Sequence, residues 1–283
     1  MKLKFTKMQG CGNDFIFIDC FPQASDYAHS INDTETLSRR LCDRNFGIGG
    51  DGVVLLLPPD NTANDARMRI FNADGSEAKM CGNATRCIGK YLYEHGYIKS
   101  GTARLETNSG VKILKIYPED VNAENSGVKS VRVDMGNVEL SELNGGSVVG
   151  RETALECGTH KITLVSVGNP HCVLFASPEL VTELGPSIER DKLFPERINV
   201  EFAEVTGYNA LRMRVWERGS GETLACGTGA CATAVAAVEN GLCDRARPIT
   251  VELRGGTLII EYTPETVFMT GPAEIVFEGE INL

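Results

Sequence analysis

The chain has 283 residues, 42% of them hydrophobic, which predicts a folded protein of two domains with a substantial core. Its formal net charge of −10 argues against the basic surface of a nucleic-acid-binding protein and favours a small-molecule ligand. The longest apolar run, Val53 to Leu57, is too short to cross a bilayer and no export signal is visible, so we expect a cytoplasmic protein without membrane contact.

The first half opens with a Gly12-Asn13 turn and a strand-like run at 15–19. A glycine-rich turn at 47–52 is superficially similar to a phosphate loop, but it lacks the Walker lysine and the complete GxGxxG spacing. A nucleotide-binding module is therefore a remote alternative. A strand is predicted at 68–72, and a polar glycine turn leads from it to Cys81.

A helix is predicted over about 84–95, with Gly96 as a favourable C′ residue. The β-rich runs at 104–107, 111–117 and 131–135 are separated by a polar loop at 119–128, which we place near a domain boundary. The second half repeats this order, with Gly168-Asn169, strands at 172–175 and 213–217, Cys226, a helix over about 229–240 ending at Gly241, and strands at 250–253 and 257–262.

The repetition is an internal duplication. The segment 67–71 (RMRIF) recurs as 212–216 (RMRVW), displaced by 145 residues, and Cys81-Gly82 falls on Cys226-Gly227 in the same register. We therefore expect an α/β (α+β) fold of two pseudo-twofold-related domains, each a mostly antiparallel β-sheet or barrel wrapped around a central helix. The domains are expected at 1–129 and 130–271, with a tail at about 272–283 that packs back on the first domain and an active site in the cleft between the two.

The ten cysteines are interpreted as reduced thiols, because disulfide frameworks are typical of short secreted proteins. A zinc module is a second remote alternative, although no pair of cysteines has the close CxxC spacing. A cysteine at a helix N-terminus lies where unpaired N–H groups and the helix dipole stabilise a thiolate. Cys81 and Cys226 both occupy such a position, and the glycine after each allows a carboxylate to approach the backbone.

Two thiols from duplicated halves suit a reaction in which one removes a proton from a carbon and the other returns a proton to the opposite face. This chemistry is racemisation or epimerisation. A hydrolase would need one nucleophile and would have no use for its duplicate. No PLP-lysine signature or flavin motif is apparent, so we expect no cofactor and no metal.

These motifs resemble the diaminopimelate epimerase family of isomerases over essentially the whole chain. The resemblance rests on GNDF at 12–15, NADGSE at 72–77 leading to CGN at 81–83, GNPH at 168–171, and ERG at 217–219 leading to CGTG at 226–229. It implies the conversion of LL-diaminopimelate into the meso isomer and back, without PLP or metal, in lysine and peptidoglycan precursor synthesis. It also implies a homodimer.

By the same resemblance, Cys81 and Cys226 are the catalytic acid and base, and backbone N–H groups of Gly82, Asn83, Gly227 and Thr228 bind the reacting α-carboxylate. His171 and Glu217 would lie close to the thiols, where they tune the pKa or bind the α-amino group. The remaining polar groups of the substrate, chiefly its distal amino acid, would be held by Asn13, Asn72, Asn169, Asn199 and Arg218.

Three positions depart from the family pattern. Gly52 stands where some members carry glutamine, Cys11 stands where leucine is frequent, and Ala84-Thr85 replaces a pair that usually contains glycine. The nearest rival is a proline or hydroxyproline racemase with the same two-cysteine chemistry. The motif at 72–83 and Arg218 favour diaminopimelate as the substrate.

Overall fold

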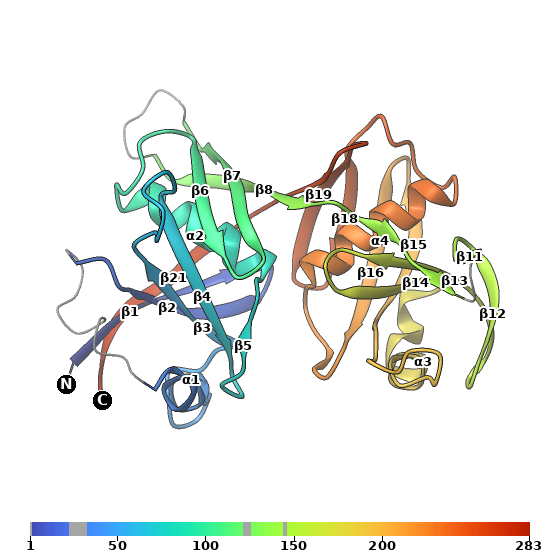
Figure 1. Ribbon diagram of the computed structural model, residues 1–283, viewed down its shortest axis with the longest axis horizontal. Helices are drawn as coiled ribbons and strands as arrows, with labels where there is room; N and C mark the ends of the chain where they lie inside the picture. Colours follow the sequence, from blue (N-terminus) through green and yellow to red (C-terminus); the bar gives the residue numbers. More distant parts are fainter. Residues whose placement is uncertain (1, 23–32, 121–125, 144–145) are drawn as a thin grey trace. The chain divides into compact units, whose positions relative to one another are not determined.

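The computed structural model spans residues 1–283 and describes all of them except 1, 23–32, 121–125 and 144–145. The expected loop at 119–128 therefore lies partly outside the described residues. Contacts within the chain define two compact units (Figure 1). The first unit comprises Met1–Val133 and Gly271–Leu283, and the second comprises Asp134–Thr270.

The first unit consists of β-strands arranged around the helix α2 (Gly82–Glu94). Most neighbouring strands are antiparallel, whereas β2 with β3 and β4 with β6 are parallel. The C-terminal strand β21 pairs with β1 along nearly its whole length. The strands are β1 (Lys2–Gly10), β2 (Asn13–Asp19), β3 (Gly52–Leu57), β4 (Ala66–Asn72), β5 (Glu77–Ala78), β6 (Thr102–Thr107), β7 (Gly110–Pro118), β8 (Val128–Gly136), whose last residues belong to the second unit, and β21 (Glu274–Asn282).

The second unit is built in the same way around α4 (Gly227–Glu239). Here β14 with β15 and β16 with β18 are the parallel pairs. Its strands are β9 (Glu139–Leu140), β10 (Glu142–Leu143), β11 (Gly146–Ser147), β12 (Arg151–Leu155), β13 (Gly158–Ser166), β14 (Pro170–Phe175), β15 (Asn199–Gly207), β16 (Ala210–Glu217), β17 (Gly221–Glu222), β18 (Ile249–Leu253), β19 (Gly256–Tyr262) and β20 (Val267–Gly271).

The strand pairing of the two units matches strand for strand. The series β1-β2-β3-β4-β6-β7 has the same alternation of parallel and antiparallel neighbours as β13-β14-β15-β16-β18-β19. An ion pair also recurs, since Arg69 binds Glu77 in one unit and Arg214 binds Glu222 in the other. The mixed, sheet-dominated fold class predicted from the duplication is confirmed.

The central helices form the middle of each core. Along α4 the alanines and valines are buried on nearly every face, as expected for a small, apolar helix enclosed by strands. In α2 the buried face also includes Arg86, whose guanidinium donates to the backbone oxygen of Pro272 and to Cys11 Sγ. Residues of the C-terminal segment are thus fastened to the helix of the first unit.

Both helices begin two residues earlier than predicted, at Gly82 and Gly227, so each cysteine is the N-cap residue itself. Their C-terminal ends agree with the prediction. Gly96 and Gly241 have φ values of +73° and +71°, the left-handed conformation of a C′ glycine. The two helices therefore start and stop at equivalent positions.

Two further helices belong to no predicted element. Helix α1 (Thr34–Cys42) is capped by Asp33, whose carboxylate accepts from Thr36 N at 3.0 Å. Helix α3 (Val181–Glu189) follows a short 3₁₀ turn and contains Pro186.

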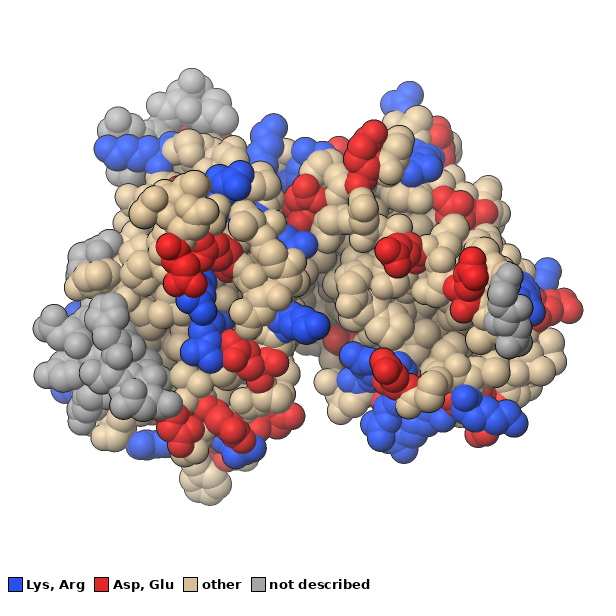
Figure 2. Space-filling view, viewed as in Figure 1, with Lys and Arg blue, Asp and Glu red and all other residues tan. Residues whose placement is uncertain are grey.

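Acidic and basic side chains are interspersed over both units on the face shown in Figure 2. Among the described residues, no helix is long and apolar enough to cross a membrane.

Candidate active site

The predicted site residues lie at the same ends of three neighbouring strands in each unit. Asn13 opens β2 and Asn169 directly precedes β14. The next strands begin at Gly52 and Asn199, which pair with Phe15 and His171. The third strands, β4 and β16, end at Asn72 and Glu217, and the chain then runs to the cysteine at the helix N-terminus.

In the first unit the cysteine thiol meets the side chain of Asn13. Cys81 Sγ lies 3.8 Å from Asn13 Oδ1, and the same oxygen accepts from Asn83 Nδ2 at 3.1 Å. Cys81 is half-buried, and its extended backbone (φ −138°, ψ 121°) turns the chain into α2. The structure thus brings Asn13, Cys81 and Asn83 together in the first unit.

A group of charged residues lies behind Asn13. Its amide nitrogen donates to Asp51 Oδ2 at 2.5 Å, and Asp51 Oδ1 accepts from Arg44 at 2.8 Å. Asp14 is bound by Arg44 at 2.7 Å and by the buried Lys7 at 2.6 Å. Burial opposes these bonds, but the hydrogen bonds from Arg44 and Lys7 prevail and lower the pKa of Asp14. The Asn13 amide is therefore hydrogen-bonded to a carboxylate, Asp51, that is itself held by an ion pair with Arg44.

Asn72 and Gly52 are register partners on β4 and β3. The Asn72 side chain is exposed and donates to Ser76 Oγ at 3.0 Å within its own turn. A Cβ at Gly52 would lie only 2.6 Å from the backbone oxygen of Phe71. The glycine that departs from the family pattern therefore allows close approach of the two strands, and a glutamine could not be added there without a backbone shift.

In the second unit the thiol of Cys226 is buried and surrounded by polar groups. Gly229 N donates to Cys226 Sγ at 3.4 Å, and Thr228 Oγ1 lies 3.4 Å from the same sulfur. Burial and, after it, the carboxylates of Glu217 and Glu201 raise the pKa of Cys226 well above its ordinary value, while Thr228 and Gly229 act in the opposite direction. These hydrogen bonds are the local stabilisation available to a thiolate here.

Glu217 is itself perturbed. Burial raises its pKa, although a hydrogen bond from Thr223 Oγ1 at 2.5 Å favours the ionised form. Its carboxyl group also interacts with the Cys226 side chain. In the second unit Glu217 therefore lies beside the thiol of Cys226.

His171 is fully buried and belongs to a chain of hydrogen bonds. Its Nδ1 lies 2.6 Å from Oε1 of Glu201, which is also fully buried. Its Nε2 lies 3.0 Å from Asn169 Oδ1, and Asn169 Nδ2 donates to Thr228 Oγ1 at 3.3 Å. The chain of contacts therefore runs from Glu201 through His171, Asn169 and Thr228 to the thiol.

The side chain of Asn199 forms a hydrogen bond with the backbone of Arg218. Arg218 N donates to Asn199 Oδ1 at 3.0 Å, and Asn199 Nδ2 donates to the oxygen of Pro170 at 2.9 Å. The exposed Arg218 guanidinium donates to Glu196 O at 3.2 Å. Through these two hydrogen bonds, Asn199 holds the backbone of the loop that carries Arg218.

Three residues near the thiols were not predicted: Asp51, Glu201 and Thr223. Asp51 had a signal, because it is the one charged residue in the glycine-rich turn at 47–52. Glu201 also had one, because it interrupts the apolar run Val200 to Ala203 inside a strand and is completely buried. The position of Thr223 depends on the turn after β16, which the sequence pattern does not specify.

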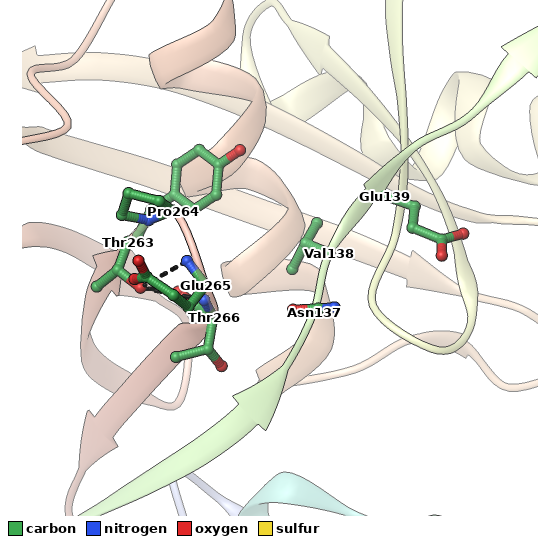
Figure 3. A pocket seen from close by; sticks show the side chains of 8 residues that line it. Asn137, Val138, Glu139, Thr263, Pro264, Glu265 and Thr266 are labelled. Atoms are coloured by element: carbon green, nitrogen blue, oxygen red, sulfur yellow. Dashed lines mark hydrogen bonds between the residues drawn. The ribbon is translucent and has the colours of Figure 1, made fainter.

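Two cavities lie at other places on the units. One of about 190 Å³ is shown in Figure 3, beside the turn between β19 and β20, where Thr263 Oγ1 accepts from Glu265 N and Thr266 N. Another of about 360 Å³ adjoins Glu106, which caps the backbone of Asp60 and Asn61. The described residues contain no cluster of three or more His, Cys, Asp or Glu side chains that could hold a metal.

Solved structures with a similar fold include a probable proline racemase, a hydroxyproline epimerase and phenazine biosynthesis proteins of the PhzF family. A probable proline racemase from Agrobacterium radiobacter superposes with a TM-score of 0.74 at 18% identity, covering 99% of this chain and 93% of that one. A hydroxyproline epimerase from Agrobacterium vitis gives 0.72 at 16% identity, covering 99% and 92%. At these identities the likeness defines the fold.

The family follows from closer sequence relatives. The family model for diaminopimelate epimerase matches residues 5–141 and 163–276. The diaminopimelate epimerase of Pelotomaculum thermopropionicum is 48% identical over 289 residues, 98% of each chain, and that of Acetivibrio thermocellus is 44% identical over 292 residues, 99% of each chain. This chain belongs to the diaminopimelate epimerase family, and the prediction of an isomerase of this family is confirmed.

Proposed function

We propose that this protein interconverts LL-diaminopimelate and meso-diaminopimelate without a cofactor, with Cys81 and Cys226 as base and acid at one α-carbon. The observation that carries the proposal is the repeated position of the two thiols. Each is the N-cap of the central helix in a duplicated fold, and each follows an equivalent pair of strands, β4 and β5 in one unit and β16 and β17 in the other. A structural thiol has no reason to recur there, whereas a two-base reaction needs one in each half.

The proposed reaction moves two protons. One thiolate takes the α-proton, so the C–H bond breaks, an S–H bond forms and the electron pair stays on the α-carbon and its carboxylate. The other thiol then gives its proton to the opposite face, which leaves the protonation states of the two cysteines exchanged. The first-turn N–H groups of Gly82, Asn83, Gly227 and Thr228 are proposed to bind the carboxylate, where helix N-termini favour the developing negative charge.

Recognition of the remaining groups is assigned to polar side chains at the strand ends. Asn13, Asn72, Asn169, Asn199 and Arg218 are proposed to bind the distal amino acid, and His171 and Glu217 are proposed to tune the thiols or bind the α-amino group. Buried amides that lose their partners penalise a truncated substrate, and discrimination of about 10⁴-fold is reachable in this way. Proline, which has no distal amino acid, is therefore expected to be a poor substrate.

The test is incubation of the purified protein with LL-diaminopimelate in D₂O. We expect meso product with deuterium at the inverted α-carbon, and activity that survives treatment with a chelator. Turnover of proline with no turnover of diaminopimelate would overturn the substrate assignment.

Cysteine variants test whether the two thiols are needed for the reaction rather than for folding. Cys81→Ala and Cys226→Ala should each lower epimerisation at least about 10³-fold, since general acid–base groups contribute about 10² to 10⁴ each. The matched control is Cys87→Ala, which removes a fully buried thiol from the same helix and should retain activity. Wild-type turnover by either site variant would refute the two-base mechanism.

We also propose that the protein is a cytoplasmic homodimer. Reduced thiols suit the cytoplasm. The C-terminal strand β21 exposes two adjacent apolar side chains, Val276 (55% exposed) and Phe277 (48%), on the strand that borders β1. Light scattering should give a mass twice the chain mass of 30.7 kDa, and the Phe277→Lys variant should have the mass of a single chain. A monomeric wild-type protein at micromolar concentration would contradict the dimer.

A further inference from the structure

An asparagine occupies an equivalent position in each unit, but Asn13 turns its oxygen toward Cys81 whereas Asn169 turns its nitrogen toward Thr228, which lies beside Cys226. Asn13 directs its carbonyl oxygen toward Cys81, as its 3.8 Å contact shows. Asn169 directs its amide nitrogen toward Thr228, the neighbour of the Cys226 sulfur. The carbonyl oxygen of an amide accepts and its nitrogen donates, so the two amides present different hydrogen-bonding groups toward the two sites.

In the first unit the orientation is set by Asp51. Its Oδ2 accepts from Asp14 N at 3.0 Å and from Asn13 Nδ2 at 2.5 Å, and its Oδ1 accepts from Arg44. An ionised carboxylate can only accept, so the nitrogen of the Asn13 amide must face Asp51. The carbonyl oxygen is then the end that faces Asn83 and Cys81.

In the second unit the orientation is set by His171. Its Nε2 faces Asn169 Oδ1, which only accepts, so Nε2 carries a proton. Asn169 Nδ2 then donates to Thr228 Oγ1. Because a threonine hydroxyl has a single proton, that proton remains available for Cys226 Sγ at 3.4 Å.

The buried Glu201 supports this assignment by charge. With Nε2 protonated, one further proton between Nδ1 and Oε1 makes the His171–Glu201 pair neutral, whichever atom holds it. In the reversed arrangement Nε2 would be bare, Nδ1 would hold the only proton and Glu201 would be a buried net negative charge. Its Oε2 has no hydrogen-bond partner among the described residues, so that charge would be uncompensated and costly.

We propose that Asp51 and His171 are positioning residues of opposite polarity, which turn an acceptor toward Cys81 and, through Asn169 and Thr228, a donor toward Cys226. The inference rests on the proposed function, in which one cysteine must be a thiol while the other is a thiolate. The acceptor favours the proton on Cys81. The hydroxyl of Thr228 and the N–H of Gly229 favour the thiolate of Cys226.

Other titratable groups interact with both thiols. Around Cys226 they are Glu217, Glu201 and His171, and the two carboxylates oppose its ionisation. In the first unit Cys81 interacts electrostatically with the buried Cys87 on α2, which also interacts with Arg86, Cys11 and Lys90. The donors matter most at Cys226, where burial and negative charge would otherwise keep the proton on sulfur.

The test compares the rates at which iodoacetamide alkylates Cys81 and Cys226 at pH 7.5, with each site quantified by peptide mass spectrometry. Asp51→Ala frees the Asn13 amide to turn its nitrogen toward the sulfur. Because one hydrogen bond to a charged group changes a thiolate population by about tenfold, the Cys81 to Cys226 rate ratio should rise about tenfold.

Two variants control for the ion pairs around Asp51. In Asp51→Asn the carbonyl oxygen can still accept from Asp14 N and Asn13, so the ratio should stay within about twofold of wild type. Arg44→Gln removes the guanidinium that binds Asp51 and should also leave the ratio within about twofold. Equal changes in Asp51→Asn and Asp51→Ala would overturn the proposal, because charge and not amide orientation would then be responsible.

The second unit is tested against Glu201→Gln, which removes the buried carboxylate while its amide can still donate to His171 Nδ1. Adding His171→Leu to this variant removes the donor that holds Asn169, and Cys226 alkylation should slow about tenfold relative to Glu201→Gln alone. Unchanged alkylation would overturn the role of His171. Thermal melts of all variants confirm that they are folded, and alkylation needs no turnover, so failure of the proposed epimerase activity is recognised separately in the wild-type assay.

Discussion

The cysteines of this chain differ in their burial and in the groups that surround them. None of the ten forms a disulfide bond, and most are buried. Burial raises the pKa of Cys20 and of Cys87 to about 12 in each case, with the charge of Asp19 adding to the effect at Cys20. The pKa of Cys226 is also raised, but of these three thiols only Cys226 accepts a hydrogen bond from the N-terminus of a helix.

The buried thiols predict a loss of stability at alkaline pH. The unfolded chain releases their protons near pH 8.5, whereas the folded protein keeps them to about pH 12, so unfolding releases protons and the free energy of unfolding falls as pH rises. Each such thiol should contribute a slope of about 1.4 kcal/mol per pH unit within that window. Urea denaturation between pH 8 and 11 measures the slope.

The control for this prediction is the double variant Cys20→Ala/Cys87→Ala. It should be less stable at neutral pH, because two buried side chains are shortened, yet its stability should depend less steeply on pH. A slope identical to that of the wild-type protein would exclude these two thiols as its source.

At this scale the sequence predicted the residues that repeat and missed those that support them. Cys81, Cys226 and the turns with Asn13 and Asn169 stand out because they occur twice. Asp51 and Glu201 have no counterpart in the other half, where the equivalent strand positions hold different residues. Which end of an amide faces a thiol depends on these partners, so it could be read only from the structure.

Among the elements, the two central helices both end at a glycine in the left-handed conformation. Gly96 and Gly241 both take positive φ values, and a Cβ built on either would meet no atom within 4 Å. Substitution there tests the left-handed backbone without a steric clash. Gly101, which has an ordinary φ and whose Cβ would lie 3.4 Å from Ile116 O, offers a matched control.

We expect Gly96→Ala and Gly241→Ala each to lower the free energy of unfolding by about 1–2 kcal/mol, the cost of a left-handed conformation for a residue with a Cβ. Gly101→Ala should change it by less than about 0.5 kcal/mol. Urea denaturation monitored by circular dichroism provides the values. Equal effects at all three positions would show that the left-handed conformation is not what Gly96 and Gly241 supply.

Strands and central helices were predictable, whereas the outer helices were not. The strand runs alternate or are β-branched, and both central helices end in a C′ glycine. Helix starts were placed two residues late, because the glycine-containing pairs at 82–83 and 227–228 look like turn residues although they form the first helical turn. Helix α3 was not predicted, because Gly185 and Pro186 interrupt its helical pattern.

For the whole molecule, the duplication is the most informative property of the sequence. It predicts two halves with the same strand order, and the matched pairing of β1 to β7 and β13 to β19 agrees with it. The alternation of parallel and antiparallel neighbours could not be predicted, because it depends on long-range pairing that leaves no local pattern. The substrate was reached through the family motifs and not through the fold, which other isomerases share.

The pairing of β21 with β1 also affects the order in which the protein can fold as it is synthesised. All residues of the second unit, 134–270, leave the ribosome before the nine residues of β21. The first unit therefore cannot be completed until β21 has been made, although most of its residues precede the second unit. Until then one edge of β1 has unpaired backbone groups and can bind another chain, which makes the nascent N-terminal half a natural client for chaperones.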